Sequence, residues 1–356
     1  MAPLTNQITV LPNPAVDDNP RDIPGSPGSV RSSHKHLKFG VTGNRQLSLQ
    51  IYSTTNTNHP TGYVDNNAPT GTIHEPGTLA GAVQNKIAVV YGIASSGSGE
   101  TGNVGICKLS PYYNPIASDD GKGPIQTNLW SLTACDNRDQ RNWIFFLRKE
   151  GTDQDSKIVL VQLVIDELDQ AAVTPLKVPT TIGAKSRLTS FYEKIPFVFF
   201  VHEGKRRGIY YINSTQAEIG ESHPFRLQSP ATGTDGENTA IPIRNTNSVI
   251  ESSPLAIVTN VSTHKNNQVF LQLTLYYVDN NGFLSYVLGT LEKDQITWLD
   301  AGETLENIEV DQTSSLCAIN GADGKTHYIY LVPDGGAAGA YKVFTTTPWQ
   351  VSPPPS

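Results

Sequence analysis

The chain has 356 residues, of which 37% are hydrophobic, and its 33 acidic and 26 basic side chains give a formal net charge of -7. This length is sufficient for a large buried core. Acidic and basic residues are interspersed, which argues against a nucleic-acid partner, because neutralising phosphates requires a clustered basic surface.

The N-terminal sequence and the cysteines indicate where the protein is located and whether disulfides or zinc stabilise it. The N-terminal stretch MAPLTNQITVLPNP lacks the apolar core of a secretory signal, and no apolar run approaches the length of a membrane span. We therefore expect a cytoplasmic protein without a membrane partner. Cys107, Cys135 and Cys317 are odd in number and far apart, so they predict neither a disulfide framework nor a zinc site.

Residues 1–33 differ from the rest in being rich in Pro, Asp, Asn and Ser, and we expect an extended arm that lies across the body. The short apolar piece Ile8 to Leu11 leaves two alternatives open. It supplies a strand to the last structural unit and so joins the chain ends, or the whole segment is a disordered tail. Residues 351–356, VSPPPS, form a Pro-rich tail that cannot join a strand ladder, because Pro lacks the amide donor.

Between these ends, short apolar stretches with aromatic pairs recur at intervals of roughly 40 to 75 residues. Most are followed by a polar turn containing Gly, Asn or Asp and by a second β-type run, so each unit predicts a strand, a hairpin and a strand. This plan is typical of the middle strands of β-propeller blades. The stretches are LSLQIY (Leu47 to Tyr52), KIAVVYGI (Lys86 to Ile93), NWIFFL (Asn142 to Leu147), PFVFFV (Pro196 to Val201), LQLTLYYV (Leu271 to Val278) and HYIYLV (His327 to Val332).

The repeats predict an all-β fold, a single six-bladed β-propeller over residues 34–350. Radial repetition leaves only short, protected sheet edges, whereas one flat sheet of this many strands would expose them. A pair of β-sandwiches is the alternative, less favoured because the units keep one internal plan. Leu163 to Val173 suggests a turn or two of helix, which Pro175 and Pro179 would end. The expected blades cover 34–78, 79–122, 123–182, 183–244, 245–305 and 306–350.

The fifth unit, LTLYYVDNNGFLSYVLGTLEKDQITWLDAG (Leu273 to Gly302), has the most specific pattern. It combines a Tyr pair, a tight Asp-Asn-Asn-Gly turn, an apolar third strand and a Trp before a Gly. This unit resembles a blade of the fungal fucose-specific lectins, which are six-bladed β-propellers. The resemblance implies a fungal fucose-lectin-like propeller.

In those lectins each sugar pocket uses an Arg two positions before the aromatic pair, a Glu on the next strand and a stacking Trp or Tyr. Here the Arg position of blade five holds Thr274, and the Glu position of blade five falls near Tyr286. Neutral or apolar side chains cannot replace the charge-assisted bonds that hold a pair of sugar hydroxyls. A fucose-binding or glycan-binding lectin without enzymatic activity is therefore kept as the alternative function.

The lectin-like fold also resembles a small group of fungal biosynthetic enzymes, the hetero-Diels-Alderases, which join a tropolone-type quinone methide to a terpene alkene. The Pro-rich arm, the non-secretory start and the eroded sugar motifs fit this group. The resemblance implies a pericyclase of terpenoid secondary metabolism with a small apolar or aromatic substrate and no cofactor or metal. Orientation of diene and alkene supplies much of such a rate, and one acid can assist loss of water from an alcohol precursor.

Such a pocket needs proton donors and aromatic walls. The candidate donors are His202 and Glu203 in FVHEGKRRG, together with Arg141 beside Trp143. His202 titrates in the range of a general acid, although a His between a strand and a turn is also typical of an exposed hairpin. The candidate walls, each with packing between blades as the alternative role, are Trp130, Trp143, Tyr277 and Trp298.

The sequence lacks the motifs of several common enzyme classes. No GxSxG, HExxH or dinucleotide-binding fingerprint is present, which disfavours hydrolases, metalloenzymes and NAD-dependent enzymes. A protein-interaction platform is the third hypothesis for function, and a homodimer stays open.

Overall fold

The structure is a computed structural model of the chain. It describes residues 4–12, 35–53, 56–64, 70–75, 77–95, 104–117, 125–137, 140–152, 156–176, 178, 180–204, 207–214, 240–263, 269–292, 295–321 and 323–350. Within these ranges the regular structure is β-strand except for a 3-10 turn at Pro348–Gln350, and no helix there is long and apolar enough to cross a membrane.

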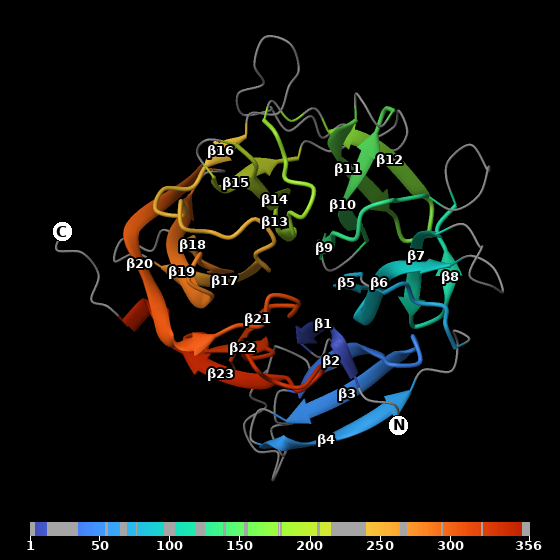
Figure 1. Ribbon diagram of the computed structural model, residues 1–356, viewed down its shortest axis with the longest axis horizontal. Coiled ribbons are helices and arrows are strands. Elements are labelled where there is room, and N and C mark those ends of the chain that lie inside the picture. The colour runs from blue at the N-terminus through green and yellow to red at the C-terminus, as the bar shows by residue number, and fades with distance from the viewer. Residues whose placement is uncertain are drawn as a thin grey trace, which may run out of the picture.

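Six antiparallel sheets surround a central axis, so the fold is the predicted all-β, six-bladed β-propeller (Figure 1). Blade 1 contains β1 (Leu4–Pro12), β2 (Lys35–Thr42), β3 (Leu47–Ser53) and β4 (Asn56–Val64). Blade 2 contains β5 (Leu79–Gln84), β6 (Ile87–Ser95), β7 (Val104–Ser110) and β8 (Asn114–Pro115). Blade 3 contains β9 (Leu132–Asp136), β10 (Asn142–Glu150), β11 (Lys157–Ile165) and β12 (Ala171–Leu176).

The remaining blades follow the same order from the axis outward. Blade 4 contains β13 (Thr189–Glu193), β14 (Ile195–His202), β15 (Gly208–Asn213) and β16 (Ile241–Pro242). Blade 5 contains β17 (Ala256–Thr263), β18 (Val269–Val278), β19 (Phe283–Glu292) and β20 (Gln295–Glu309). Blade 6 contains β21 (Cys317–Asn320), β22 (His327–Leu331) and β23 (Lys342–Thr346).

The N-terminal strand corrects one expectation. Ile8 to Leu11 does not add a strand to the last blade, because β1 pairs antiparallel with β2 and is the innermost strand of blade 1. Its other side lies against blade 6, where the backbone N–H of Ser315 donates to the carbonyl of Asn6 at 3.0 Å. The chain ends are thus joined by contact between blades, without a shared sheet. Residues 13–33 of the expected arm and the tail 351–356 lie outside the described residues.

Two local predictions were also wrong. The stretch at Leu47 to Tyr52 is the third strand of its blade and not a middle strand, because β1 precedes β2 in the sheet. Leu163 to Val173 forms the hairpin between β11 and β12 in place of a helical turn. Its residues pair across the hairpin, with Leu163 opposite Val173, so both arms belong to the blade 3 sheet.

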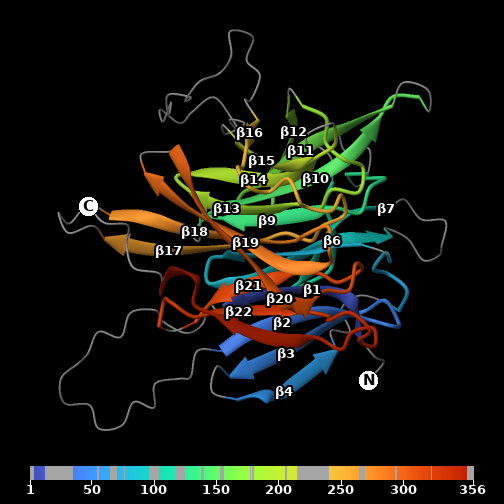
Figure 2. The same ribbon diagram turned by 60° about the vertical axis from the view of Figure 1, so that its left-hand side comes forward.

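The hydrophobic core is divided into layers between neighbouring blades, and this explains the aromatic pairs. Phe145 packs with blade 4 residues, whereas Phe146, the next residue of β10, packs with blade 2 residues. Successive side chains of a strand point to opposite faces of its sheet, and in a propeller both faces are covered. Figure 2 shows the sheets following one another face to face around the ring. A middle strand is therefore apolar on both faces, as the run from Trp143 to Leu147 is.

A side-chain hydrogen bond recurs across the blade interfaces. A buried Tyr on the middle strand of one blade contacts a side chain at the start of the next blade's middle strand. Tyr276 lies 2.7 Å from Nδ1 of His327, between blades 5 and 6. The Asn142 amide donates to Tyr91 at 2.7 Å, between blades 2 and 3, and His36 lies 2.8 Å from Tyr330, between blades 1 and 6. Each contact satisfies a phenol that would otherwise be buried without a partner.

A short sequence repeat precedes the inner strands of blades 4, 5 and 6. It reads Ile or Val, three residues, Ser, one residue, Leu, and its serines are Ser186, Ser253 and Ser314. Each buried Ser hydroxyl accepts a hydrogen bond, at 2.8 Å, from a backbone N–H at the end of its blade's middle strand. The repeat fixes each inner strand against its own blade.

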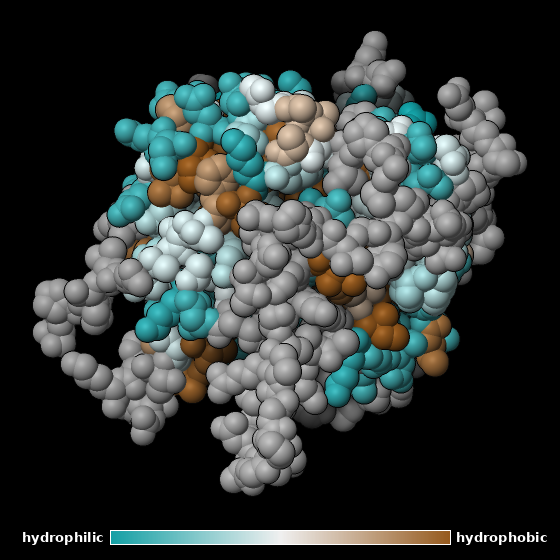
Figure 3. All heavy atoms as spheres, turned by 90° about the horizontal axis from the view of Figure 1, so that it is seen from below, coloured by the Kyte–Doolittle hydropathy of each residue, from teal (hydrophilic) through white to brown (hydrophobic). Residues whose placement is uncertain are grey.

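The surface seen from below carries hydrophobic residues in separate groups among hydrophilic ones, as far as the coloured residues of Figure 3 show. Single apolar side chains at the surface are ordinary for folded proteins.

The buried His327 predicts a pH-dependent stability. Burial lowers the pKa of His327 from 6.5 to about 4, although Asp323 acts in the raising direction. Between pH 6.5 and pH 4 the His327 imidazole is protonated in the unfolded chain but not in the folded protein. The free energy of unfolding should therefore fall as pH falls through this range, by up to about 3 kcal/mol. His327→Asn, which copies the Asn142 of blade 3, should lose this dependence while keeping a partner for Tyr276. Urea unfolding of both proteins across this pH range tests it, and parallel curves would contradict the assignment.

Candidate functional site

Among the cavities that the described residues form, two differ in place and in size. One, of about 140 Å³, is on the propeller axis and is lined by the inner strands. The other, of about 570 Å³, lies between blades 2 and 3, where β7 and β8 face the hairpin of β11 and β12. The second has the volume of an ordinary small-molecule site. Its apolar lining comes from Pro115, Ile116, Ala117, Ile165, Ala171 and Ala172.

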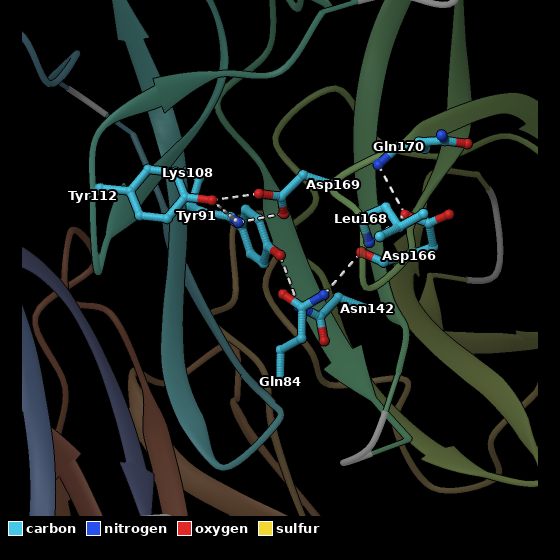
Figure 4. Close-up of polar contacts among 9 residues, drawn as sticks. All are labelled: Gln84, Tyr91, Lys108, Tyr112, Asn142, Asp166, Leu168, Asp169 and Gln170. Atoms are coloured by element: carbon cyan, nitrogen blue, oxygen red, sulfur yellow. Dashed lines mark hydrogen bonds and ion pairs between the residues drawn. The ribbon is translucent and has the colours of Figure 1, made fainter.

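Three polar side chains meet at this cavity between blades 2 and 3. Lys108 on β7, which is almost completely buried, forms an ion pair with Asp169 of the facing hairpin. Tyr112 donates a hydrogen bond to the other oxygen of the Asp169 carboxylate, and Lys108 donates to the Tyr112 hydroxyl at 3.2 Å. Figure 4 shows Lys108 and Tyr112 on one side of the interface and Asp169 on the other. The contacts therefore join two blades through one carboxylate.

The turn between β11 and β12 aims Asp169 at blade 2. Oδ1 of Asp166 accepts hydrogen bonds from the backbone N–H groups of Leu168 and Gln170, each at 2.9 Å. Asp169 itself has a φ of 58°, a left-handed conformation that Asp tolerates better than most residues. The Asp166 carboxylate thus holds the turn, and the Asp169 carboxylate is left to face Lys108.

The walls of this cavity are fixed by further contacts across the same interface. Nε2 of Gln84 donates to the carbonyl of Asp166 at 2.9 Å, and the Tyr91 and Asn142 pair lies nearby in Figure 4. The backbone N–H of Val83 donates to Asp136 at 2.7 Å. These contacts hold the cavity walls in place before a ligand binds, so ordering the walls on binding would cost little free energy.

The electrostatics favour an oxygen-bearing ligand. Burial alone would raise the pKa of Asp169, but the hydrogen bonds from Lys108 and Tyr112 and the Lys108 charge hold it below its ordinary value. Asp169 is therefore ionised at neutral pH. An ammonium has three donors, and the contacts of Lys108 use two of them, on Asp169 and Tyr112. The third can reach an acceptor oxygen of a ligand in the cavity that Lys108 lines.

The predicted proton donors lie elsewhere and do not converge. His202 ends β14 in blade 4, with its ring 4.7 Å from that of Tyr210, and Glu203 follows it on the surface. Arg141 precedes β10 in blade 3, where its charge acts on Tyr192 of blade 4. None of these three residues lines either cavity. Their catalytic role stays a prediction.

The predicted aromatic walls form packing contacts. Trp143 is fully buried and stacks on Tyr192, with ring centroids 4.7 Å apart. Tyr277 and Trp298 belong to the apolar layer between blades 4 and 5. Trp130 is 37% exposed and stacks on His74 at 4.2 Å. These four residues also lie outside the lining of the two cavities.

Sequence reasoning missed the residues that line the larger cavity. Lys108 lies in the strand VGICKLS, and a Lys is rarely buried in a strand. Asp169 lies in Leu163 to Val173, the segment whose sequence suggested a helical turn, so its place in a hairpin was not expected. A detectable signal is the Pro-Tyr-Tyr-Asn-Pro run, which places Tyr112 in the turn directly after β7, the strand that carries Lys108.

Among the residues that the structure describes, no group of three or more His, Cys, Asp or Glu could hold a metal ion.

No family model matches the chain. Two curated proteins are similar to it along most of their length, each named wall-associated proteinase, from Coccidioides immitis (strain RS) and Coccidioides posadasii (strain RMSCC 757 / Silveira). Each is 29% identical over 338 residues, which cover 93% of this chain and 93% of the relative.

Solved structures of other proteins share the architecture. The Aleuria aurantia lectin, a six-bladed β-propeller that recognises fucose, matches with a TM-score of 0.58 at 7% identity, covering 95% of this chain and 91% of the lectin. AofleA from Arthrobotrys oligospora matches with a TM-score of 0.55 at 9% identity, covering 97% and 87%. At these identities the likeness shows the fold alone.

The positions compared with the lectin sugar motif are occupied by internal contacts in blade five. Thr274 is buried and accepts a hydrogen bond from Nε1 of Trp349 at 3.0 Å. The Tyr286 hydroxyl donates to Glu303 at 2.9 Å. Thr274 therefore supplies no cationic fork for a sugar at this position.

The ion pair between blades 2 and 3 predicts a non-additive effect on stability. Asp169→Asn should lower the free energy of unfolding by about 1–3 kcal/mol, because it leaves the buried Lys108 ammonium without a carboxylate, an effect moderated by the partial exposure of Asp169. Lys108→Met in the same chain should restore part of the loss. Urea unfolding of the two single variants and the double variant measures the coupling, and additive losses would show that the two charges act independently.

Proposed function

We propose that the chain binds a small organic molecule, with an apolar body and an acceptor oxygen, in the cavity between blades 2 and 3. The further proposal is that it acts there as a cofactor-independent cyclase of the hetero-Diels-Alder type, joining a tropolone-type quinone methide to a terpene alkene. The observation that carries the proposal is the juxtaposition of the buried Lys108 ammonium with a cavity of about 570 Å³ whose lining is partly apolar and partly polar.

Part of the lining supports an apolar body on the ligand. Apolar surface comes from both blades, for example from Ile116 of blade 2 and Ile165 of blade 3. Binding of an apolar body would remove this surface from water, which is favourable.

The chemistry asks the protein for orientation and for stabilisation of charge. In the proposed cyclisation a carbon–carbon bond and a carbon–oxygen bond form from two π systems, and no atom is gained or lost. Negative charge develops on the carbonyl oxygen of the quinone methide, and a fixed ammonium at hydrogen-bond distance stabilises it. Asp169 and Tyr112 orient the Lys108 ammonium, so these residues position the donor.

The curated relatives support a second candidate, proteolysis. They are named wall-associated proteinase, and the likeness spans 93% of both chains. The described contacts of His327 are with Tyr276 and Asn260 and supply no activated nucleophile.

Binding of tropolone, an unreactive analogue of the flat partner, tests the proposed site. Titration calorimetry should give saturable binding to the wild type and to the control Lys157→Met, which removes an exposed Lys at the far end of β11. Lys108→Met should weaken binding about tenfold or more, because a hydrogen bond from a charged donor is lost. Equal affinity in Lys108→Met and wild type would contradict the site.

Activity assays separate the candidate functions. With an alcohol precursor, which loses water to give the quinone methide, and a terpene alkene, the proposal expects an adduct with the summed mass of precursor and alkene less one water. Formation of this adduct should fall in Lys108→Met but not in Lys157→Met. Casein should stay intact, and the protein should pass through a fucose column unretained. Casein cleavage by the purified chain would favour proteolysis, and fucose retention would favour the lectin alternative.

A further inference from the structure

The cavity on the propeller axis contains a charge that the proposed function does not use. Residues from all six blades line it, and among the described lining residues Arg187 is the charged one. The neighbouring lining residues are small or apolar, such as Thr78, Ala134 and Leu255. A guanidinium in such surroundings requires an explanation, because removing a charge from water is costly unless a partner compensates it.

The sequence repeat before the inner strands identifies Arg187 as an exception. It directly follows Ser186 in blade 4, and the corresponding residues of blades 5 and 6 are Pro254 and Ser315. In blade 2, the residue before the inner-strand Leu79 is Thr78. The fold therefore does not require a cation at this position, and blade 4 alone of these four blades places one against the axis.

The contacts of Arg187 do not neutralise it. Its guanidinium reaches across the axis to blade 6, where Nη1 donates to the carbonyl of Ser314 at 3.2 Å and Nη2 to that of Thr313 at 3.5 Å. Both acceptors are neutral, and a guanidinium has five N–H donors. Within the described ranges, Arg187 forms no ion pair with a carboxylate. Donors are therefore left for a ligand in the cavity.

A second cationic side chain, Lys38 of blade 1, lies beside Tyr341 of blade 6, with Nζ 5.3 Å from the ring centroid. Burial raises the pKa of Tyr341 well above its ordinary value, although the Arg187 charge acts in the lowering direction. Lys38 is buried, and burial lowers its pKa to about 8, so it is still mostly cationic at neutral pH. The charge of Arg187 thus acts on the ring that Lys38 contacts, where blades 6 and 1 meet.

We propose that the axial cavity binds a small oxyanion, a carboxylate or phosphate group, on the guanidinium of Arg187. The planar fork of Arg matches two oxygens of such a group, and the cavity of about 140 Å³ has room for a small anion. The anion connects blade 4 to blade 6 through Arg187, and its binding stabilises the closed ring.

Thermal unfolding and titration calorimetry of the full chain test the axial site, with sodium phosphate and sodium acetate as probes and sodium chloride at equal ionic strength as the reference. Phosphate, acetate or both should bind saturably to the wild type and raise its Tm above the chloride value. The arm that responds distinguishes a phosphate from a carboxylate ligand. The control Arg207→Met, which removes an exposed Arg of the same blade, should respond like the wild type.

Arg187→Met should lose the response to both anions, and in chloride its Tm should equal or exceed that of the wild type, because an uncompensated charge is removed. Should this variant fail to fold, Arg187→Gln keeps an N–H donor for the Ser314 carbonyl without the charge, and it should lose the response equally. An unchanged response in the neutral variants would reduce the anion to an adventitious ion only and overturn the proposal. The absence of saturable binding of either anion to the wild type would overturn it as well.

Discussion

Every blade of this molecule must bury both of its faces, and the remaining features follow from that constraint. A three- or four-stranded sheet is too small to hide its apolar side chains alone, so each blade is stable only between two neighbours. The contact between β1 and blade 6 closes the ring, with the apolar cluster of Ile8, Val10, Ile319 and Tyr330 between them. The hydrogen bond between Tyr330 and His36 crosses the same junction. Loss of this closure would expose the faces of two blades at once.

The same constraint explains where a cavity forms. The outermost strand of blade 2, β8, has two residues, whereas β12 of blade 3 has six. The short strand leaves the outer part of this interface less filled than the interior, where Ile144 and Phe146 pack against Tyr91 and Ile106. Lys108, on the third strand of blade 2, is therefore close to an open space even though its side chain is buried. A charge at this depth is held by Asp169, which the hairpin of the next blade supplies.

Much of the fold could be predicted from the sequence, because burial of both faces of a middle strand leaves a visible mark. The runs containing Phe145 and Phe146, or Phe199 and Phe200, indicate strands without a solvent face. The place of β1 could not be predicted, since nothing in Ile8 to Leu11 indicates which sheet edge it meets. The repeat around Ser186, Ser253 and Ser314 was visible in the sequence, yet its meaning depends on hydrogen bonds to strands that the repeat itself does not identify.

The cavity between blades 2 and 3 was harder to predict, because Lys108 and Asp169 are 61 residues apart and belong to different blades. Aromatic residues chosen as pocket walls, such as Trp143, are instead the residues that an interface between blades needs for packing. The central claim is that a ligand occupies this cavity. A crystal of the wild-type protein soaked with tropolone tests it most directly. The expected result is the tropolone ring between β7 and the β11–β12 hairpin, with an oxygen within hydrogen-bond distance of Lys108 Nζ; tropolone seated elsewhere, with this cavity holding only water, would contradict the claim.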